Sequence, residues 1–491
     1  MKKLDKKINR REFVRLSALG AGAAILAACA PNAVETATSL PAAQPTAVPA
    51  TQAAAASAPT ALPAATAAPV AAQQATTITW ESWGGADRFT PFIQTFGKTY
   101  PDTAKWLTIK AVSGGAQDAD MYQQLRVAMA AGGEELPDIF EANLSAVPEF
   151  AARGLLPDLS EKMKPFLADL VPGALKVASY KGKIVAIPSQ VKSKVWYYRK
   201  DLFQNAGIDP AAIKTFDDLI AAGKGFHEKN PDSYIMNLSS QPAAYWYAEI
   251  LSTWDDVSFA DETGKWLVKD NAHVSTMMDW MKQIIDVGIA YKTDDWSSDW
   301  QPAVAAGKIG SFLIGSWMTS FIPQFAPDQK DKWGLALWPD FMREGSEAGG
   351  SIEGISSFSK NMDAAFEFCS DFWLKPEGAV AWWQLTGLAP VTQSGQDALL
   401  KQIPTMQKPA DMKDSDWAVA PINYYGKDFM NTIFESMKHV KVFPYDMSFS
   451  AELPILQHHT EAYIAGKETL AQALEGTQTD MQSQIGNPYK I

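Results

Sequence analysis

The stretch KGKIVAIPSQVKSKVWYYRKDLF, residues 181–203, contains two short apolar runs, IVAIP at 184–188 and VWYY at 195–198. Val, Ile, Trp and Tyr favour strands, and Pro188 ends the first run or confines it to a sheet edge. The polar bridge between the runs is too long for a tight hairpin turn and too short for a helix. The pattern predicts that the chain leaves one sheet here and enters another. A β-meander inside a single domain is the alternative.

Length, charge and cysteine content narrow the class of protein. The chain has 491 residues, for which two domains are expected, and 47% of them are hydrophobic. The formal net charge is −12, although residues 1–28 are basic. The remainder therefore offers no basic surface to phosphates, and nucleic acid is not an expected partner. The only cysteines are Cys29 and Cys369. Because Cys29 lies in a processing signal, we expect no intrachain disulfide in the folded part.

The N-terminus has the pattern of an export signal. Basic residues precede an apolar run, 16–28, that is too short to span a bilayer. Arg10-Arg11 begins a sequence that resembles the twin-arginine motif, and LAAC at 26–29 resembles a lipobox. We predict that 1–29 is a lipoprotein signal peptide with Cys29 as the lipid-anchored residue, exported by the twin-arginine or the Sec route. A buried N-terminal helix is the alternative.

A linker follows the signal, and the folded part begins after it. Residues 30–75 consist almost entirely of Ala, Pro, Thr, Gln and Ser, which cannot bury enough apolar surface to fold. TTITWESWGG at 76–85 then alternates apolar and polar residues and predicts a first strand. A second strand is expected at 107–114 and helices at 118–133, 215–230 and 273–288.

Two polar or aromatic residues follow predicted strands. Ligands of open α/β sheets lie at the carboxyl ends of strands, so Trp83 is a candidate binding residue; packing under its own loop is the alternative. Asn143 follows a later strand, and its amide can both donate to and accept from sugar hydroxyls. Capping the next helix is an equal possibility for Asn143.

A loop rich in tryptophan and aspartate occupies 291–300, YKTDDWSSDW. Aspartates accept hydrogen bonds from hydroxyls and an indole covers the apolar face of a sugar, so Trp300 is a further candidate. Alternatively, the aspartates cap and solvate the loop. The loop lacks the Gly and terminal Glu of a calcium loop, and we predict no metal site.

Three runs resemble one known family. KGKIVAIP…VWYYRKDLFQNAGID…KTFDDLIAAGKGF at 181–226, GKIGSFLIGSW at 307–317 and GGSIEGISSFSKNMDAAFEF at 349–368 are similar to bacterial extracellular solute-binding proteins. The similarity is to the maltose-binding-protein-like branch, which serves ABC importers of sugars and oligosaccharides. It implies an α/β, two-lobed periplasmic-binding-protein fold (type II, Venus-flytrap) with discontinuous lobes joined by a multi-segment hinge.

The resemblance also implies lobe boundaries and site residues. The N-terminal lobe would comprise 76–189 plus 308–356, and the C-terminal lobe 190–307 plus 357–491. Lys192 is the one cation that we place at the cleft, with a solvated linker charge as its alternative. The other residues implied to contact the ligand are Tyr245, Trp246, Trp317, Glu353 and Tyr445. An aromatic stripe on a helix is more often core than ligand site, which weighs against Tyr245 and Trp246.

The expected function is binding rather than catalysis. The sequence contains none of the common hydrolase, nucleotide-binding, zinc-protease or thiol-redox motifs, and we predict no catalytic residue and no cofactor. The resemblance implies a monomeric receptor that captures a carbohydrate and delivers it to an ABC permease, with the membrane reached only through the lipid anchor. Binding of another solute (a peptide, polyamine, phosphodiester or iron chelate), a secreted glycan-degrading enzyme and a protein that presents ligand to a chemoreceptor are the alternatives.

Overall fold

The computed structural model describes residues 74–490 except 85, 256, 346–349 and 409–411. The described residues belong to one compact unit. The predicted signal peptide, Cys29 and nearly all of the predicted linker lie outside the described residues.

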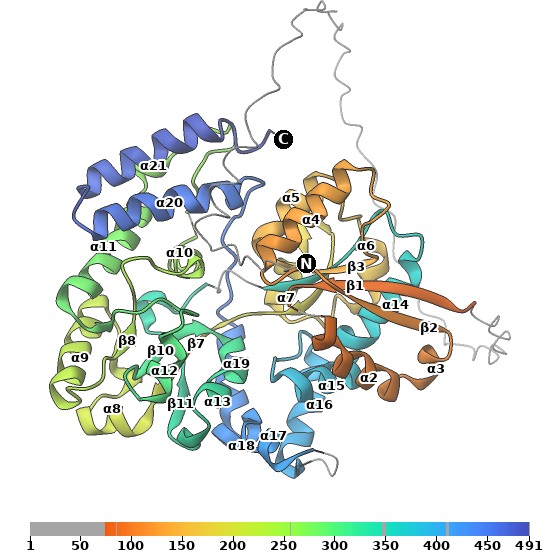
Figure 1. Ribbon diagram of the computed structural model, residues 1–491, viewed down its shortest axis with the longest axis horizontal. Coiled ribbons are helices and arrows are strands. Elements are labelled where there is room, and N and C mark those ends of the chain that lie inside the picture. The colour runs from red at the N-terminus through yellow and green to blue at the C-terminus, as the bar shows by residue number, and fades with distance from the viewer. Residues whose placement is uncertain (1–73, 85, 256, 346–349, 409–411, 491) are drawn as a thin grey trace, which may run out of the picture. The chain divides into compact units, whose positions relative to one another are not determined.

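A five-stranded sheet with the order β2-β1-β3-β12-β6 organises the first half of the fold (Figure 1). Its strands are β1 (Thr76–Ser82), β2 (Leu107–Ser113), β3 (Ile139–Asn143), β6 (Ile187–Gln190) and β12 (Ser351–Ile355). β1 is parallel to β2 and β3, whereas β12 runs antiparallel to β3 and β6. The predicted first and second strands are confirmed. The helices packed with this sheet are α2 (Thr90–Thr99), α4 (Asp118–Ala130), α5 (Val147–Ala152), α7 (Pro172–Val177), α14 (Met362–Cys369), α15 (Pro376–Thr386) and α16 (Gln393–Gln402).

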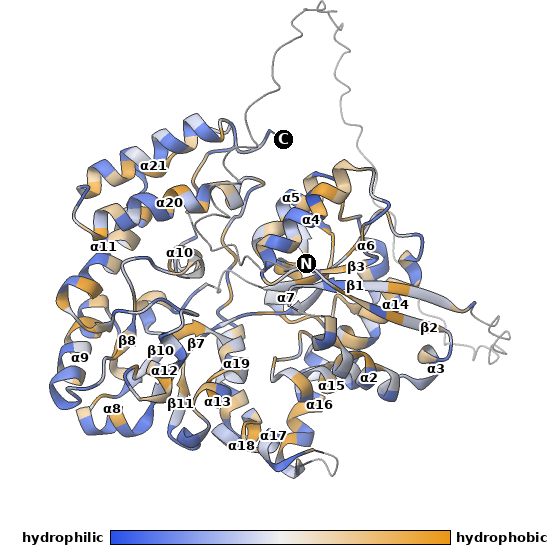
Figure 2. Ribbon diagram, in the orientation of Figure 1, coloured by the Kyte–Doolittle hydropathy of each residue, from blue (hydrophilic) through white to orange (hydrophobic). Residues whose placement is uncertain are grey.

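A three-stranded sheet organises the second half. β7 (Lys194–Arg199) lies between β10 (Ser311–Gly315) and β11 (Trp333–Ala336), and both neighbours are antiparallel to it. The elements around it are α8 (Lys200–Ala206), α9 (Phe216–Lys229), α10 (Ala244–Leu251), α11 (Ala272–Val287), α12 (Trp300–Ala305), α19 (Phe429–Met437), α20 (Phe449–Ile464) and α21 (Leu470–Gln484). In Figure 2, α20 and α21 show alternating apolar and polar residues, as expected of helices that bury one face.

The opening stretch crosses between the two sheets as predicted, since β6 belongs to the first and β7 to the second. Residues 191–193 connect them and are called the first crossing below. Residues 337–350 connect β11 to β12 and form the second crossing. A third segment, 438–448, joins α19 to α20 and is called the seam connector, because its Val440 packs against Gly173 of α7 in the first half.

Strand β7 is buried on both faces. Val195 and Tyr197 belong to the hydrophobic cluster that also contains Trp80 of β1, whereas Trp196 belongs to the cluster formed with α9, α10 and α11. Successive side chains of a strand point to opposite faces, so the run VWYY supplies both clusters at once. The neighbouring strand repeats the pattern, with Phe312 in the first cluster and Leu313 in the second.

Two parts of the structure differ from the predicted lobe boundaries. The strand Ser311–Gly315, which we expected to return to the first half, pairs with β7 along its whole length. The helices after residue 357, which we expected in the second half, pack on the first sheet: Phe368 of α14 contacts Trp80, and Trp382 of α15 contacts Phe92. β12 is therefore the strand that returns the chain to the first sheet.

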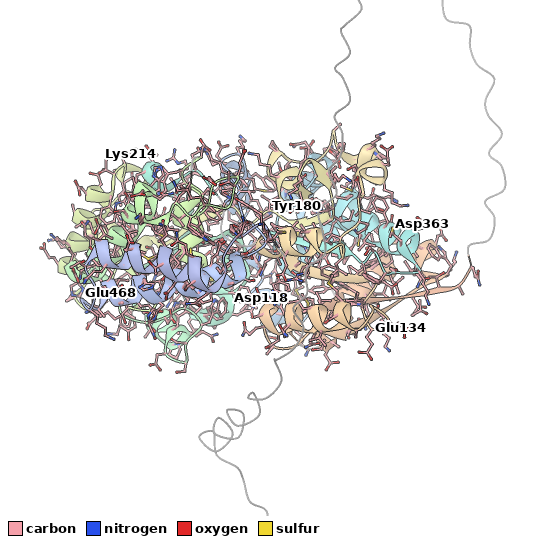
Figure 3. All side chains as sticks on the ribbon, turned by 90° about the horizontal axis from the view of Figure 1, so that it is seen from above. Asp118, Glu134, Tyr180, Lys214, Asp363 and Glu468 are labelled. Atoms are coloured by element: carbon pink, nitrogen blue, oxygen red, sulfur yellow. The ribbon has the colours of Figure 1, made fainter. Side chains whose placement is uncertain are left out.

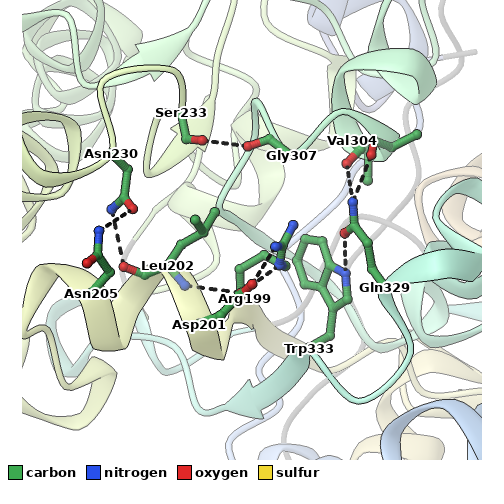
Figure 4. Close-up of polar contacts among 11 residues, drawn as sticks. Arg199, Asp201, Leu202, Asn205, Asn230, Ser233, Val304, Gly307, Gln329 and Trp333 are labelled. Carbon is green, nitrogen blue, oxygen red and sulfur yellow. Dashed lines mark hydrogen bonds and ion pairs between the residues drawn. The ribbon is translucent and has the colours of Figure 1, made fainter.

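Polar contacts fix the far end of the second sheet (Figure 4). Arg199, the last residue of β7, donates from Nε and Nη2 to the Asp201 carboxylate at 2.8 and 2.6 Å. Gln329 accepts from Trp333 Nε1 at 2.9 Å and donates to the carbonyl of Val304 at 3.1 Å. These bonds satisfy buried polar groups where the strands end, so the end of β7 away from the crossing is held in one position.

Helix α9 begins with the predicted capping box. The Thr215 hydroxyl accepts from the Asp218 amide at 3.1 Å, and the Asp218 carboxylate accepts from the Thr215 amide at 2.9 Å. We predict that Thr215→Ala lowers the free energy of unfolding by about 1 kcal/mol, because the Asp218 amide loses its acceptor. Urea unfolding measures this change. Thr276→Ala, a half-buried position inside α11 that caps no helix, is the matched control and should change stability by less than about 0.5 kcal/mol. Equal losses in the two variants would contradict the prediction.

Candidate functional site

Three side chains meet beside the first crossing and are called the crossing cluster: Asp118, Asn143 and Lys192. Asn143 Nδ2 donates to Asp118 Oδ2 at 2.7 Å, and Lys192 Nζ lies 3.5 Å from Asn143 Oδ1. Asn143 makes no side-chain bond to the amides of the helical turn that follows it, so the capping alternative for this residue is wrong. Asn143 and Lys192 are both half-buried, and the structure brings these two predicted residues together.

Trp83 lies at the end of β1, where we expected it. It is half-buried and packs against the hydrophobic cluster of Phe140 and Phe150. The preceding Ser82 donates to Glu141 Oε2 at 2.5 Å and so ties the carboxyl end of β1 to β3. Trp83 is thus partly packed and partly accessible, and its contact with a ligand stays a prediction.

Four aromatic residues form what we call the aromatic shelf: Trp296, Trp317, Phe321 and Phe325. The Trp296 and Trp317 rings stack with centroids 5.7 Å apart and planes 26° apart. Trp296 is 44% exposed, and its φ of 64° lies in the left-handed region. Such a backbone costs about 1–2 kcal/mol in a residue with a Cβ, and strain of this kind concentrates at functional sites. The composition of residues 291–300 predicted a sugar site in this loop, but Trp300 was the predicted contact and Trp296 was not.

The shelf is attached to the first crossing through the backbone. The amide of Ser316 donates to the carbonyl of Ser193 at 2.8 Å, which places Trp317 directly beside the residue that follows Lys192. The crossing cluster and the aromatic shelf are therefore both joined to the same short connection, the cluster through Lys192 and the shelf through Ser193.

Trp246 supports the loop that carries the shelf. It is buried in the second cluster, and its indole nitrogen donates to Asp295 Oδ2 at 3.3 Å. Asn237 Nδ2 donates to the other oxygen of the same carboxylate at 2.9 Å. Trp246 thus positions the loop next to Trp296, whereas we had expected it to present its ring to a ligand. The side chain of Tyr245 lies outside the described residues.

Two predicted ligand contacts are wrong. Trp300 is completely buried between Phe312 and Phe325, at centroid distances of 5.6 and 5.4 Å. Glu353 is 1% exposed and accepts from Trp80 Nε1 at 3.0 Å. Glu353 lies in β12, which has a strand on each side and covered faces, so its side chain points into the core instead of a cleft.

A separate cavity of about 400 Å³ lies where the seam connector meets the first half. Tyr445 lines it together with residues of α5, α7 and the short strand β4 (Ser179–Tyr180) from the first half and with Ser258 and Tyr489. We call it the seam cavity. None of Asp118, Asn143 and Lys192 lines this cavity, although Leu144, which follows Asn143, does. Figure 3 labels Asp118 of the crossing cluster and Tyr180 of the cavity wall. Tyr445 lies edge-on to Phe449 at 4.6 Å, which holds its ring at the cavity wall.

Two carboxyl groups lie next to this cavity. Asp446 lines it, and Glu452 of α20 is buried behind. Burial, followed by the charge of Asp446, raises the pKa of Glu452 to about 10, and burial also raises the pKa of Asp446. Glu452 is consequently protonated at neutral pH and can donate a hydrogen bond to its neighbour.

The described residues contain no group of three or more His, Cys, Asp or Glu side chains arranged to hold a metal ion. Among them there is also no helix that is long and apolar enough to cross a membrane.

Taken together, two α/β halves joined by crossings, with aromatic and polar residues gathered at the first crossing, define a two-lobed solute-binding fold. A family model described as bacterial extracellular solute-binding protein matches residues 91–413. The chain belongs to this family.

Individual proteins agree with this assignment. The chain is similar to the arabinooligosaccharide-binding protein of Bacillus subtilis, with 23% identity over 64% of this chain and 73% of that protein. Among solved structures, it resembles the ABC transporter-associated binding protein of B. animalis subsp. lactis in complex with β-1,6-galactobiose (TM-score 0.66, 22% identity, 84% of this chain and 99% of that one). It also resembles the galacto-N-biose/lacto-N-biose I-binding protein of Bifidobacterium longum (TM-score 0.65, 18% identity, 86% and 100%). These structures share its two-lobed fold.

The raised pKa of Glu452 should make the stability of the protein depend on pH. In the unfolded chain this carboxyl ionises near its ordinary pKa of 4.5, whereas in the folded protein it keeps its proton to about 10. The folded state therefore binds more protons between these values, and the free energy of unfolding falls as pH rises. Glu452→Gln removes the carboxyl group and with it this pH dependence. The variant should therefore be at least about 1 kcal/mol more stable than wild type at pH 8, with no difference in the free energy of unfolding near pH 4.

Urea unfolding at several pH values measures the effect. Glu475→Gln, an exposed residue of α21, is the control and should follow the wild-type curve. A Glu452→Gln variant with the wild-type pH dependence would show that Glu452 is ionised in the folded protein.

Proposed function

We propose that this protein captures a sugar or oligosaccharide between its two lobes and delivers it to an ABC permease. Membership of the solute-binding family supports the transport role. The sugar assignment is supported by the relatives, which are named for arabinooligosaccharide and diacetylchitobiose, and by fold neighbours solved with galactobiose and lacto-N-biose.

The aromatic shelf beside the first crossing carries the proposal. The exposed ring of Trp296, stacked on the half-buried Trp317, suits the apolar C–H face of a pyranose, and nearby amide, carboxylate and ammonium groups can exchange hydrogen bonds with the sugar hydroxyls. Trp296 and Trp317 provide the rings, and Asn143 and Lys192 provide the polar groups. Because these groups belong to different halves, a ligand that contacts all of them favours the closed arrangement over the open one.

The remaining predicted residues have flanking roles in this proposal. Trp83 supplies a second apolar surface in the first half, and Tyr445 with the seam cavity accepts a further sugar unit of a longer ligand. A role for Tyr245 rests on the family resemblance. We assign no residue a catalytic role, and in this proposal the ligand is delivered to the permease chemically unchanged.

The sheet pairings support a revised division of the lobes. We propose that the first lobe comprises 76–190 and 351–402, and the second 194–336 and 449–486. The described residues of 403–437 pack against both lobes, because the hydrophobic cluster to which they belong also contains side chains of both sheets. The halves move about the first crossing, the second crossing and the seam connector.

Location and anchoring follow from the N-terminal pattern. The family is extracellular, and we propose that Cys29 is lipid-modified after export and that 30–75 form the linker to the folded part. In this arrangement a monomer bound to the membrane by its lipid alone meets the permease.

The central test is a panel of neutral mono- and oligosaccharides, arabinooligosaccharides included, scored by thermal shift. A ligand at 100 times its Kd stabilises the folded state by about 2.7 kcal/mol, which a melting curve resolves. For the sugar that stabilises the wild type, Trp296→Ala and Trp317→Ala should each weaken binding at least tenfold in calorimetry, or about 1.4 kcal/mol.

Trp417→Ala is the matched control, because Trp417 is also half-buried but lies on α17 (Asp414–Ala418), which carries no residue of the shelf. It should bind the sugar as tightly as the wild type. Stabilisation by peptides or polyamines but by no saccharide would refute the sugar assignment, and release of a shortened saccharide would identify an enzyme.

A second test addresses the anchor. Wild-type protein expressed in a bacterium should fractionate with membranes, and Cys29→Ala should appear in the soluble extracytoplasmic fraction, because the thioether-linked lipid is lost. Cys369→Ala serves as the control, since that thiol is buried in the fold. Membrane association of Cys29→Ala equal to that of the wild type would exclude the anchor at Cys29.

A further inference from the structure

Lys194, the first residue of β7, is a buried lysine directly after the first crossing. It is 2% exposed. Its ammonium group lies 4.8 Å from the centre of the Trp338 ring, a favourable cation–π distance. Lysine is almost never fully buried unless its charge is compensated, so the partners of this residue are informative.

All three protons of the Lys194 ammonium have an acceptor. Nζ donates to the carbonyl of Glu344 at 2.7 Å, to the carbonyl of Met342 at 3.0 Å and to Thr253 Oγ1 at 3.1 Å. Two of these acceptors belong to the second crossing, and the third follows α10. One side chain therefore connects the start of β7 to the segment that carries the chain back to the first sheet.

The same segment is also bound by the seam connector. His439 Nδ1 lies 2.7 Å from Glu344 Oε1, and the Gly345 amide donates to the His439 carbonyl at 2.9 Å. Residues 342–345 thus lie between Lys194 on one side and His439 on the other. The start of β7, the second crossing and the seam connector therefore meet at this short segment.

We propose that Lys194 is a positioning residue that makes the first crossing, the second crossing and the seam connector move as one unit during ligand capture. It need not touch the ligand. By holding residues 342–345 to β7, it ensures that rotation at the first crossing is accompanied by the second crossing and the seam connector. The consequence for ligand affinity rests on the function proposed above; the mechanical role does not.

The charge of Lys194 depends on its surroundings. Burial lowers its pKa to about 7, opposed by Glu249 of α10 and by Glu344, while Lys441 of the seam connector lowers it further. The ammonium form has three donors for the three acceptors, whereas the neutral amine has two. The connection should therefore be tightest below pH 7 and weaker above it.

Hydrogen exchange tests the mechanical role without any ligand. The Gly345 amide, bonded to His439, is the reporter. In Lys194→Met, which keeps the length and apolar volume of the side chain, this amide should exchange at least about tenfold faster than in wild type at pH 6.5. Amides of α9 and α11 should be unchanged, which separates loss of the connection from loss of the fold.

Lys282→Met is the matched control. Lys282 also lies over an aromatic ring, that of Tyr463 at 5.6 Å, and is half-buried, but none of its partners belongs to the second crossing or to the seam connector. It should leave exchange at Gly345 at the wild-type rate. Wild-type exchange of Gly345 in Lys194→Met would overturn the proposal.

Calorimetry with the saccharide that stabilises the wild type tests the consequence for capture. Affinity of the wild type should fall as pH rises from 6 to 8.5, and Lys194→Met should bind at least about fivefold more weakly at pH 6 with a flat pH profile. Faster exchange together with wild-type affinity at every pH would also overturn the proposal, because the connection would then have no part in capture. If no saccharide binds the wild type, the proposed function fails, and exchange at Gly345 alone decides whether Lys194 couples the connections.

Discussion

Burial of β7 on both faces is the constraint on which the arrangement of the two halves depends. Its side chains alternate between two hydrophobic clusters, with Tyr197 in one and Trp196 in the other. A shift of one residue along the chain would exchange these large rings and place each in a space built for the other. The register of β7 is therefore fixed, and with it the position at which the first crossing leaves the first sheet.

This constraint explains why the crossing was predictable from the sequence. A short run of Val, Trp and Tyr without polar alternation is typical of a strand covered on both sides, and the polar residues before it exclude a single continuous strand. Helix α9 was predictable for a local reason as well, because Thr215 and Asp218 complete a capping box within four residues. Signals of this kind are contained in neighbouring residues and need no knowledge of the rest of the fold.

Pairing partners and burial were not predictable in this way. The strand Ser311–Gly315 is apolar enough to join either sheet, and only contacts with β7, more than a hundred residues earlier, decide between them. The loop 291–300 has two tryptophans of similar sequence context, yet Trp296 is exposed and Trp300 is enclosed by Phe312 and Phe325. Composition identified the loop as suited to a sugar, but the backbone conformation that turns Trp296 outward is determined by tertiary contacts. The prediction that Glu353 contacts the ligand was wrong for the same reason, since nothing near Glu353 in the sequence indicates that β12 lies inside the sheet.

The polar bridge is mostly buried, and its burial has a physical consequence. Ser189, Gln190, Ser193 and Lys194 are all at most 7% exposed. Buried polar groups must be hydrogen-bonded in one geometry or remain costly, so they specify an arrangement more narrowly than apolar packing does.

Ser193 pairs with the Ser436 hydroxyl at 2.7 Å and accepts from the Ser316 amide, and Lys194 uses all three of its protons. An apolar bridge could slide between alternative contacts, whereas this one cannot move without breaking several bonds at once. Lys192 is the residue of the bridge that reaches the crossing cluster. The residues that hold the bridge in place and the residue that faces the proposed ligand are, in this fold, next to each other in the chain.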